Sequence, residues 1–160
     1  MTINIIKKLH HRPPYLLIDE VIEISPQHIH VVKTPQLEEF YLQGHFPGVP
    51  VVPGAIMQEM TTQAAGLLIT EFYSPVADYD SEKTKGYALG VLRSIHQAKY
   101  KKFARPDNIL NIKVNLLLHI ESSFRFKAII ESNGEKIMSN EFTLINISEE
   151  QMMGINQKTE

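Results

Sequence analysis

The arrangement of apolar and polar residues along the chain predicts one long buried helix. Residues 54–72 follow Pro53 and precede Ser74-Pro75, and small or apolar side chains occupy nearly every face of this segment. Proline suits the start of a helix, and a helix that is apolar almost all round is a buried one. One face of the helix collects residues at spacings of three and four: Ile56, Glu59, Met60, Gln63 and Leu67.

Strands are predicted on both sides of this helix. They are rich in β-branched and aromatic residues or alternate in polarity: residues 16–24, 28–33, 87–100, 109–121, 122–132 and 136–147. Asn133-Gly134, between the last two, is a strong hairpin signal. One helix among five or six mainly antiparallel strands predicts an α+β fold in which a sheet wraps around the helix. This order of elements is that of the hotdog fold.

Loops and one polar tail are predicted for the rest of the chain. Residues 38–53 contain Gly and Pro at many positions, and residues 78–85 are mostly polar. We find no internal repeat, low-complexity tract or linker, so residues 1–160 are expected to form a single domain. The polar residues from about Ser148 are expected to fray at its end.

Composition narrows the classes of function. The chain has 160 residues and a net charge of −2, so no global positive field favours nucleic-acid binding. It contains no cysteine, which excludes disulfides, thiolate nucleophiles and zinc–thiolate sites. The N-terminal lysines follow a short apolar run, whereas in a signal peptide the positive charges precede the apolar run. No apolar run is long enough for membrane insertion. A cytoplasmic protein is therefore expected.

His45 and Glu59 are the candidate catalytic residues. Glu59 is the only acidic or basic side chain between Phe40 and Thr70, and His45 is the only other group there that titrates near neutrality. Taken singly, either residue would more often be structural. Together, in an apolar stretch broken by Gly and Pro, a proton acceptor and a carboxyl indicate proton-transfer chemistry.

Other polar positions carry weaker signals. Gly54-Ala55 at the helix start lets a ligand approach the backbone closely. Gln63 lies one turn beyond Glu59, where it either holds the carboxyl or simply packs at the edge of the core. His28 and His30 are spaced like metal ligands on one strand, but the sequence offers no third ligand. We therefore expect solvent-facing histidines and no metal site.

Several segments form a combination that is more specific than any one motif. They are residues 9–19, residues 40–48 with the sequence His-Phe-Pro-Gly, residues 50–54, Glu59 and residues 63–66. Together they resemble the β-hydroxyacyl-[acyl-carrier-protein] dehydratases of fatty acid synthesis, from about residue 9 to about residue 147. The resemblance supports the hotdog fold. Arg12 and Asp19 match the family's opening segment, and structural hydrogen bonding is expected of both.

The resemblance implies roles for the site residues. His45 would take the α-proton of a 3-hydroxyacyl thioester, and Glu59 would orient or protonate the leaving hydroxyl. The backbone N–H of Gly54 would polarise the thioester carbonyl. The products would be a trans-2-enoyl thioester and water, formed without a cofactor or metal. In the family the histidine and the glutamate come from different subunits, so a homodimer is required, and a trimer of dimers stays open.

A protein partner is implied as well. Acyl carrier protein is acidic, and a basic run of this chain resembles a segment of the family. Docking is therefore expected through a set of cations: Lys99, Lys101, Lys102 and Arg105. Without the resemblance, the same residues would be read as a solvated strand edge.

Three other functions are alternatives on the same fold: an acyl thioesterase, a dehydratase that also isomerises the double bond, and a non-catalytic subunit that binds the carrier protein. The isomerising branch typically has Asp where this chain has Glu59, and thioesterases generally lack the histidine–glutamate motif. Departures from the family at residues 87–90, Phe103 and residues 107–108 leave the acyl chain length open. They also leave open the choice between housekeeping and specialised (polyene or polyunsaturated) synthesis.

Overall fold

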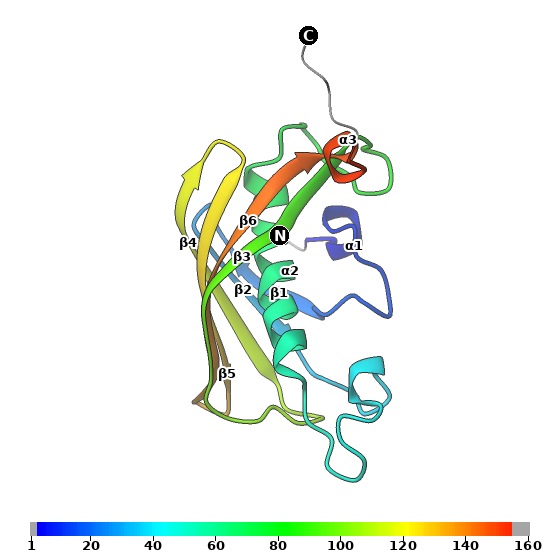
Figure 1. The fold of residues 1–160 in the computed structure, drawn as a ribbon, viewed down its shortest axis with the longest axis vertical. Helices are drawn as coiled ribbons and strands as arrows, with labels where there is room; N and C mark the ends of the chain where they lie inside the picture. Colours follow the sequence, from blue (N-terminus) through cyan, green and yellow to red (C-terminus); the bar gives the residue numbers. More distant parts are fainter. Residues whose placement is uncertain (1–2, 155–160) are drawn as a thin grey trace.

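A 19-residue helix, α2 (Gly54–Phe72), lies against one face of a six-stranded sheet in the computed structural model, which describes residues 3–154 (Figure 1). From Met57 to Thr70 every residue of α2 is buried except Glu59, which is half-buried. The predictions of a helix over residues 54–72 and of its burial on nearly all sides are confirmed. A single half-buried carboxyl in such a helix marks the place where the core opens to a site.

The strands are ordered β1-β2-β4-β5-β6-β3, and each neighbouring pair is antiparallel. Their bounds are β1 Glu20–Ile24, β2 His28–Lys33, β3 Tyr87–Tyr100, β4 Leu110–Ile120, β5 Ser123–Ser132 and β6 Glu135–Ser148. The edge strands β1 and β3 therefore have one neighbour each, and β3 is the longer of the two. The predicted α+β hotdog architecture is confirmed.

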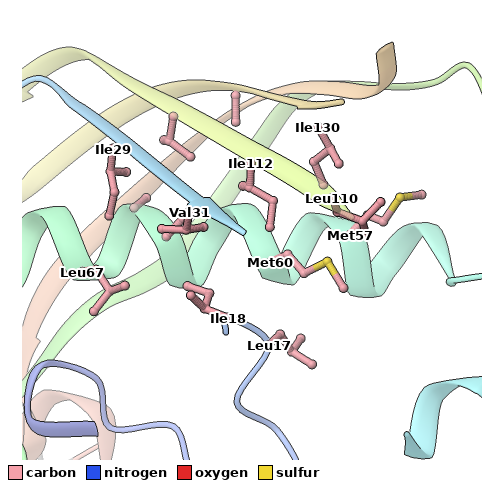
Figure 2. Close-up of a cluster of buried hydrophobic side chains, with 14 of the residues drawn as sticks. Leu17, Ile18, Ile29, Val31, Met57, Met60, Leu67, Leu110, Ile112 and Ile130 are labelled. Atoms are coloured by element: carbon pink, nitrogen blue, oxygen red, sulfur yellow. The ribbon is translucent and has the colours of Figure 1, made fainter. Parts of the chain in front are cut away.

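The core fills the space between α2 and the sheet and continues on the opposite side of α2, where Leu17 and Ile18 lie (Figure 2). Its members come from four strands, from α2 and from the segment before β1: Leu17, Ile18, Ile29, Val31, Met57, Met60, Leu67, Leu110, Ile112, Ile130 and Phe142 among others. Each fully buried side chain of this size stabilises the fold by roughly 1.5–3 kcal/mol. On β5 and β6, Phe124, Phe126 and Leu144 face inward and are almost fully buried.

The N-terminal segment covers the side of α2 that faces away from the sheet. Helix α1 (Ile5–Lys8) lies beside α2 in Figure 1, and Lys8 Nζ is 3.0 Å from Glu71 Oε2. Further along, the backbone N–H of Leu17 donates to Gln63 Oε1 at 2.9 Å. The segment thus runs from the C-terminal end of α2 towards its middle and completes the burial of the helix.

Two glycines bring β3 close to α2. A Cβ added at Gly90 would lie 3.1 Å from the Cα of Gly66, and Gly90 has a φ of +71°. Both the close approach and the positive φ favour glycine at position 90. The first half of β3 consequently lies directly against the helix that carries Glu59.

Some short elements were not predicted. Of the strand expected over residues 16–24, only Glu20–Ile24 forms a strand, β1. A 3₁₀ turn, Phe40–Leu42, interrupts the predicted loop. The tail predicted to fray from Ser148 instead begins with helix α3 (Glu149–Met152), and residues 155–160 lie outside the described residues. Across residues 3–154, no helix is long and apolar enough to cross a membrane.

Candidate active site

His45 sits in the loop before α2 with its ring held in one orientation. Its Nδ1 lies 2.8 Å from the carbonyl oxygen of Val51. Because a carbonyl can only accept, Nδ1 carries the proton and donates it, and the neutral ring keeps Nε2 as a free acceptor. The ring also stacks on Phe46, with centroids 4.2 Å apart. This tautomer is the one that a general base needs.

The helix start lies in the same cavity as His45. This cavity, which we call the His45 pocket, has a volume of about 660 Å³. The backbone N–H groups of Ile56 and Met57 both donate to Pro53, so the amides of Gly54 and Ala55 precede the first bonds of the helix. Such N–H groups, at the positive end of the helix dipole, stabilise an oxyanion. Gly54 thus lies at the helix start and lines the same cavity as His45.

Tyr100 explains why residue 54 is a glycine. A Cβ at Gly54 would lie 2.9 Å from Cε1 and 3.2 Å from Cζ of the Tyr100 ring, closer than carbon atoms pack. The ring lies against the helix start and lines the His45 pocket, although nearly half of the residue is exposed. This contact between the end of β3 and the start of α2 was not predicted from the sequence.

One oxygen of Glu59 is held by its own chain. Gln63 Nε2 donates to Glu59 Oε1 at 3.0 Å, and His11 Nε2 lies 3.4 Å from the same oxygen. No partner of the second oxygen, Oε2, is found among residues 3–154. The carboxyl is therefore anchored through Oε1 and can present Oε2 to a ligand.

Gln63 is fixed by two further hydrogen bonds. Its Nε2 donates to the Tyr15 carbonyl at 2.8 Å, and its Oε1 accepts the Leu17 N–H at 2.9 Å. The residue is fully buried. Of the two readings of Gln63, the geometry supports the one in which it holds the carboxyl of Glu59. The same cluster affects Tyr15, whose pKa is raised by burial and by the nearby Glu59.

His45 and Glu59 of one chain face different cavities. Glu59 borders a second cavity of about 580 Å³, which we call the Glu59 pocket. It is lined by the N-terminal segment, α2, the first half of β3 and the C-terminal α3, and it shares no lining residue with the His45 pocket. The His45 pocket lies at the Tyr100 end of β3, and the Glu59 pocket lies at its Tyr87 end. A single chain therefore does not bring the two groups into one cavity.

The predicted docking cations gather at the His45 pocket. Lys101, Lys102 and Arg105 line it together with Phe103, which is 72% exposed. Lys102 forms an ion pair with Glu135. Lys99 is exposed on β3 and is not part of the lining. The cavity is thus lined by three basic side chains, one of them paired with Glu135, and by an exposed aromatic ring.

The remaining candidates have structural partners. Arg12 donates to the carbonyls of Leu9 and His11 at 2.7 and 2.9 Å. Asp19 accepts from Lys33 Nζ at 2.9 Å.

His28 and His30 each bond an asparagine of β4, Asn115 and Asn111, at 3.0 and 2.9 Å. Among residues 3–154 no group of three His, Cys, Asp or Glu side chains is arranged to hold a metal ion. These two histidines therefore serve the pairing of β2 with β4.

His11 is the site residue that sequence reasoning overlooked. His11 lies in residues 9–19, one of the segments that resemble the family, and its contact with Glu59 spans 48 positions of the chain. Such a contact can be read only from the fold, because the N-terminal segment must first lie along α2.

Solved structures of similar shape support the fold. The dehydratase heterocomplex ApeI:P from Xenorhabdus doucetiae contains a chain that matches with a TM-score of 0.80 and 22% identity, covering 99% of this chain and 100% of that one. A hypothetical thioesterase from Streptococcus pneumoniae, solved with coenzyme A, matches with a TM-score of 0.58 and 16% identity, covering 81% and 85% of the two chains. At these identities the likeness concerns the fold alone.

Sequence relatives are closer. Residues 9–141 match the FabA-like domain family. The 3-hydroxyacyl-[acyl-carrier-protein] dehydratase FabZ of Thioalkalivibrio sulfidiphilus is 33% identical over 137 residues, which is 85% of this chain and 89% of that protein. The FabZ of Burkholderia lata is 36% identical over 133 residues, 82% of this chain and 81% of that protein. With a match over most of its length and relatives at this identity, the chain belongs to the FabA-like family, alongside the FabZ dehydratases.

Proposed function

We propose that this protein is a hydro-lyase that converts (3R)-hydroxyacyl-[acyl-carrier-protein] thioesters to trans-2-enoyl thioesters and water, in the synthesis of fatty acids or related acyl chains. His45 Nε2 removes the proton from carbon 2, while Glu59 gives its proton to the hydroxyl that leaves carbon 3 as water. The electrons of the broken C–H bond form the carbon 2–carbon 3 double bond. The Gly54 N–H stabilises negative charge on the thioester oxygen. The substrate undergoes no net oxidation or reduction, so the reaction needs no redox cofactor.

The observation that carries this proposal is the tautomer of His45 together with the anchoring of Glu59. Because His45 Nδ1 donates to Val51, Nε2 is left as the basic nitrogen of a residue that lines the His45 pocket. The bond from Gln63 to Glu59 Oε1 leaves the other carboxyl oxygen for the substrate. A base, an acid and a helix-start N–H are the three groups that eliminating water from a 3-hydroxyacyl thioester requires.

The proposed site is assembled from two copies of the chain. The two pockets lie at opposite ends of β3, and β3 is an edge strand. Pairing two copies of β3 antiparallel about a two-fold axis places the Tyr100 end of one strand beside the Tyr87 end of the other. The His45 pocket of one copy then adjoins the Glu59 pocket of its partner, and each dimer contains two complete sites.

Exposed apolar residues on β3 support this pairing. Leu92 and Ile95, near the middle of the strand, are 38% and 49% exposed in the single chain. A strand edge with unpaired N–H and C=O groups and exposed apolar side chains is a template for association unless it is covered. In this proposal the partner's β3 covers it. A trimer of such dimers would leave both sites intact, because the site uses only this edge.

The carrier protein is proposed to dock at the mouth of the His45 pocket. Three of the four predicted cations line that mouth, and an acidic partner would be attracted to them. A carrier protein docked there would place the thioester group at Gly54 and carbon 2 at His45, with carbon 3 further from the carrier protein. We propose that the enzyme works in the cytoplasm on this carrier-bound substrate.

Turnover of carrier-bound 3-hydroxyacyl substrates tests the function directly. Enoyl product is expected from the wild-type chain, and it should disappear in both His45→Ala and Glu59→Gln. Release of free thiol without enoyl product would instead identify a thioesterase. The absence of either product, with the carrier protein still bound, would identify a non-catalytic binding subunit.

A further inference from the structure

A buried cation lies beside the segment that leads to His45. Lys33, the last residue of β2, is 6% exposed and is the only Asp, Glu, Lys or Arg that is buried among residues 3–154. Its Nζ lies 2.9 Å from Asp19 Oδ1 and 2.8 Å from Glu39 Oε1. A buried charge is costly unless it is paired, so the two carboxylates are what allow a cation at this position. The proposed reaction uses none of these three residues.

The amino group of Lys33 stays charged in this setting. Burial by itself would lower the pKa of Lys33, but the hydrogen bonds to Glu39 and Asp19 outweigh burial, and the pKa is raised. An opposite charge and a hydrogen bond both favour the ionised form. The contacts are therefore made between full charges, which hold their partners more firmly than neutral groups do.

Asp19 connects Lys33 to the sheet. Its Oδ2 accepts the N–H of Thr34 at 2.7 Å, and its own N–H donates to the carbonyl of Val32 at 2.9 Å. These bonds continue the pairing of β1 with β2 by one residue before β1 begins. Asp19 therefore holds the end of β2 and does not reach the loop that contains His45.

Glu39 connects Lys33 to the loop. Its Oε1 also accepts the Gln36 N–H at 3.1 Å. Its carbonyl accepts the N–H of Leu42 at 2.9 Å, which closes the 3₁₀ turn Phe40–Leu42. The carbonyl of Leu42 accepts the N–H of His45 at 3.4 Å. Glu39 is thus linked to the proposed base by two successive backbone hydrogen bonds.

The other side of His45 is held by a separate anchor. The N–H of Val52 donates to the carbonyl of Ala104 at 2.8 Å, and the N–H of Val51 donates to the carbonyl of His45 at 2.9 Å. The Val51 carbonyl that receives His45 Nδ1 is thus tied to the segment after β3. The bond from the ring to Val51 keeps its geometry only while the anchor before His45 also stays in place.

We propose that Lys33, acting through Glu39, positions His45 so that Nδ1 donates to Val51 and Nε2 stays available as the base. This inference rests on the proposed dehydratase function and adds two positioning residues to it. Neither Lys33 nor Glu39 lines either of the two pockets, so neither touches the substrate. Such residues can still control the rate, because misplacing a reacting group by about 1 Å can cost roughly 100-fold.

Three variants of the full-length protein test the inference. Glu39→Ala removes the partner of Lys33 that leads to His45. Asp19→Ala is the matched control, because it removes a carboxylate from the same amino group but from the side that holds the sheet. Glu39→Gln keeps an oxygen that can accept from Lys33. Each variant is assayed for kcat and KM with a carrier-bound 3-hydroxyacyl thioester, at a temperature at which its circular dichroism shows that it is folded.

Glu39→Ala should lower kcat by roughly 10- to 100-fold with little change in KM, because the loop displaces the base and not the docking surface. Glu39→Gln should recover most of that loss. Asp19→Ala should leave kcat unchanged, although it lowers stability. Equal loss of kcat in Glu39→Ala and Asp19→Ala would overturn the inference, since it would indicate a general loosening of the fold. A wild-type kcat in Glu39→Ala would overturn it as well.

The ring of His45 gives a readout that does not depend on turnover. Nitrogen NMR of histidine-labelled protein reports which ring nitrogen carries the proton, and the His45 signals are those that disappear in His45→Ala. At alkaline pH, Nδ1 should be protonated in the wild type and in Asp19→Ala, whereas both tautomers should be populated in Glu39→Ala. An unchanged ring signal in Glu39→Ala would contradict the positioning role. A wild-type chain that dehydrates no substrate would refute the proposed function, and the ring signals would then decide by themselves whether Glu39 positions His45.

Discussion

Replacing Gln63 by leucine should both destabilise the protein and slow the reaction. Leucine has a similar volume but cannot bond, so the buried N–H of Leu17 and C=O of Tyr15 both lose the partner that they have in the structure. Each orphaned buried group costs about 1–3 kcal/mol, and the added apolar burial offsets part of that. The expected net loss in the free energy of unfolding is about 2–4 kcal/mol. At this chain length each kcal/mol lowers Tm by about 2–4 °C.

The activity of Gln63→Leu should fall for a separate reason. The variant also loses the 3.0 Å bond that anchors Glu59 Oε1. A hydrogen bond to a carboxyl group that can carry charge is worth about 1.5–3 kcal/mol, so kcat should drop by roughly 10- to 100-fold, at temperatures where the variant is still folded.

Urea unfolding at one fixed protein concentration gives the stability, because the stability of a dimer depends on concentration. Enoyl formation from a carrier-bound substrate gives kcat. Thr70→Val is the matched control: Thr70 is a buried polar residue of the same helix, and its hydroxyl bonds only the Gly66 carbonyl within that helix. It should cost less than about 1 kcal/mol and leave kcat unchanged. If Gln63→Leu matched Thr70→Val in both measurements, the hydrogen-bonding role of Gln63 would be refuted.

Two further predictions concern the surfaces that the proposal uses. Lys101→Glu should raise KM for carrier-bound substrate several-fold and weaken its salt dependence, but leave turnover of a carrier-free pantetheine thioester unchanged. Lys127→Glu, on exposed β5 surface, is the control, and equal effects in both variants would contradict a local docking site. Ile95→Asp should convert the dimer to inactive monomers in light-scattering measurements. Ile22→Asp, at a residue 51% exposed on the opposite edge strand, should leave the assembly intact, and a dimer that survives Ile95→Asp would exclude pairing through β3.

Much of the fold could be predicted because its signals are local. Proline before residue 54 and Ser74-Pro75 after residue 72 bound α2, and Asn133-Gly134, both with positive φ, turns β5 into β6. The helix α3 was missed because a single turn is unstable by itself and forms where tertiary contacts hold it. Its one local signal was the capping box between Ser148 and Gln151.

The site was predictable only in part. His45, Gly54 and Glu59 lie close together in the chain and form a motif, so the resemblance identified them. Contacts of His11 with Glu59 and of Tyr100 with Gly54 join distant segments, and no pattern within either segment predicts them. The separation of His45 and Glu59 into two pockets is likewise a property of the folded chain, because fourteen residues of sequence do not show which way each side chain faces.

The central claim is that His45 of one chain works with Glu59 of another, and mixing two inactive variants tests it most directly. His45→Ala and Glu59→Gln are co-expressed with different tags, and the mixed dimers are purified through both tags. Each mixed dimer then contains one intact site, with His45 from the Glu59→Gln chain and Glu59 from the His45→Ala chain. The mixed dimer should have about half the activity of the wild-type dimer, because one of its two sites works. Mixed dimers as inactive as either parent would contradict it, because a site built within one chain cannot be restored by mixing.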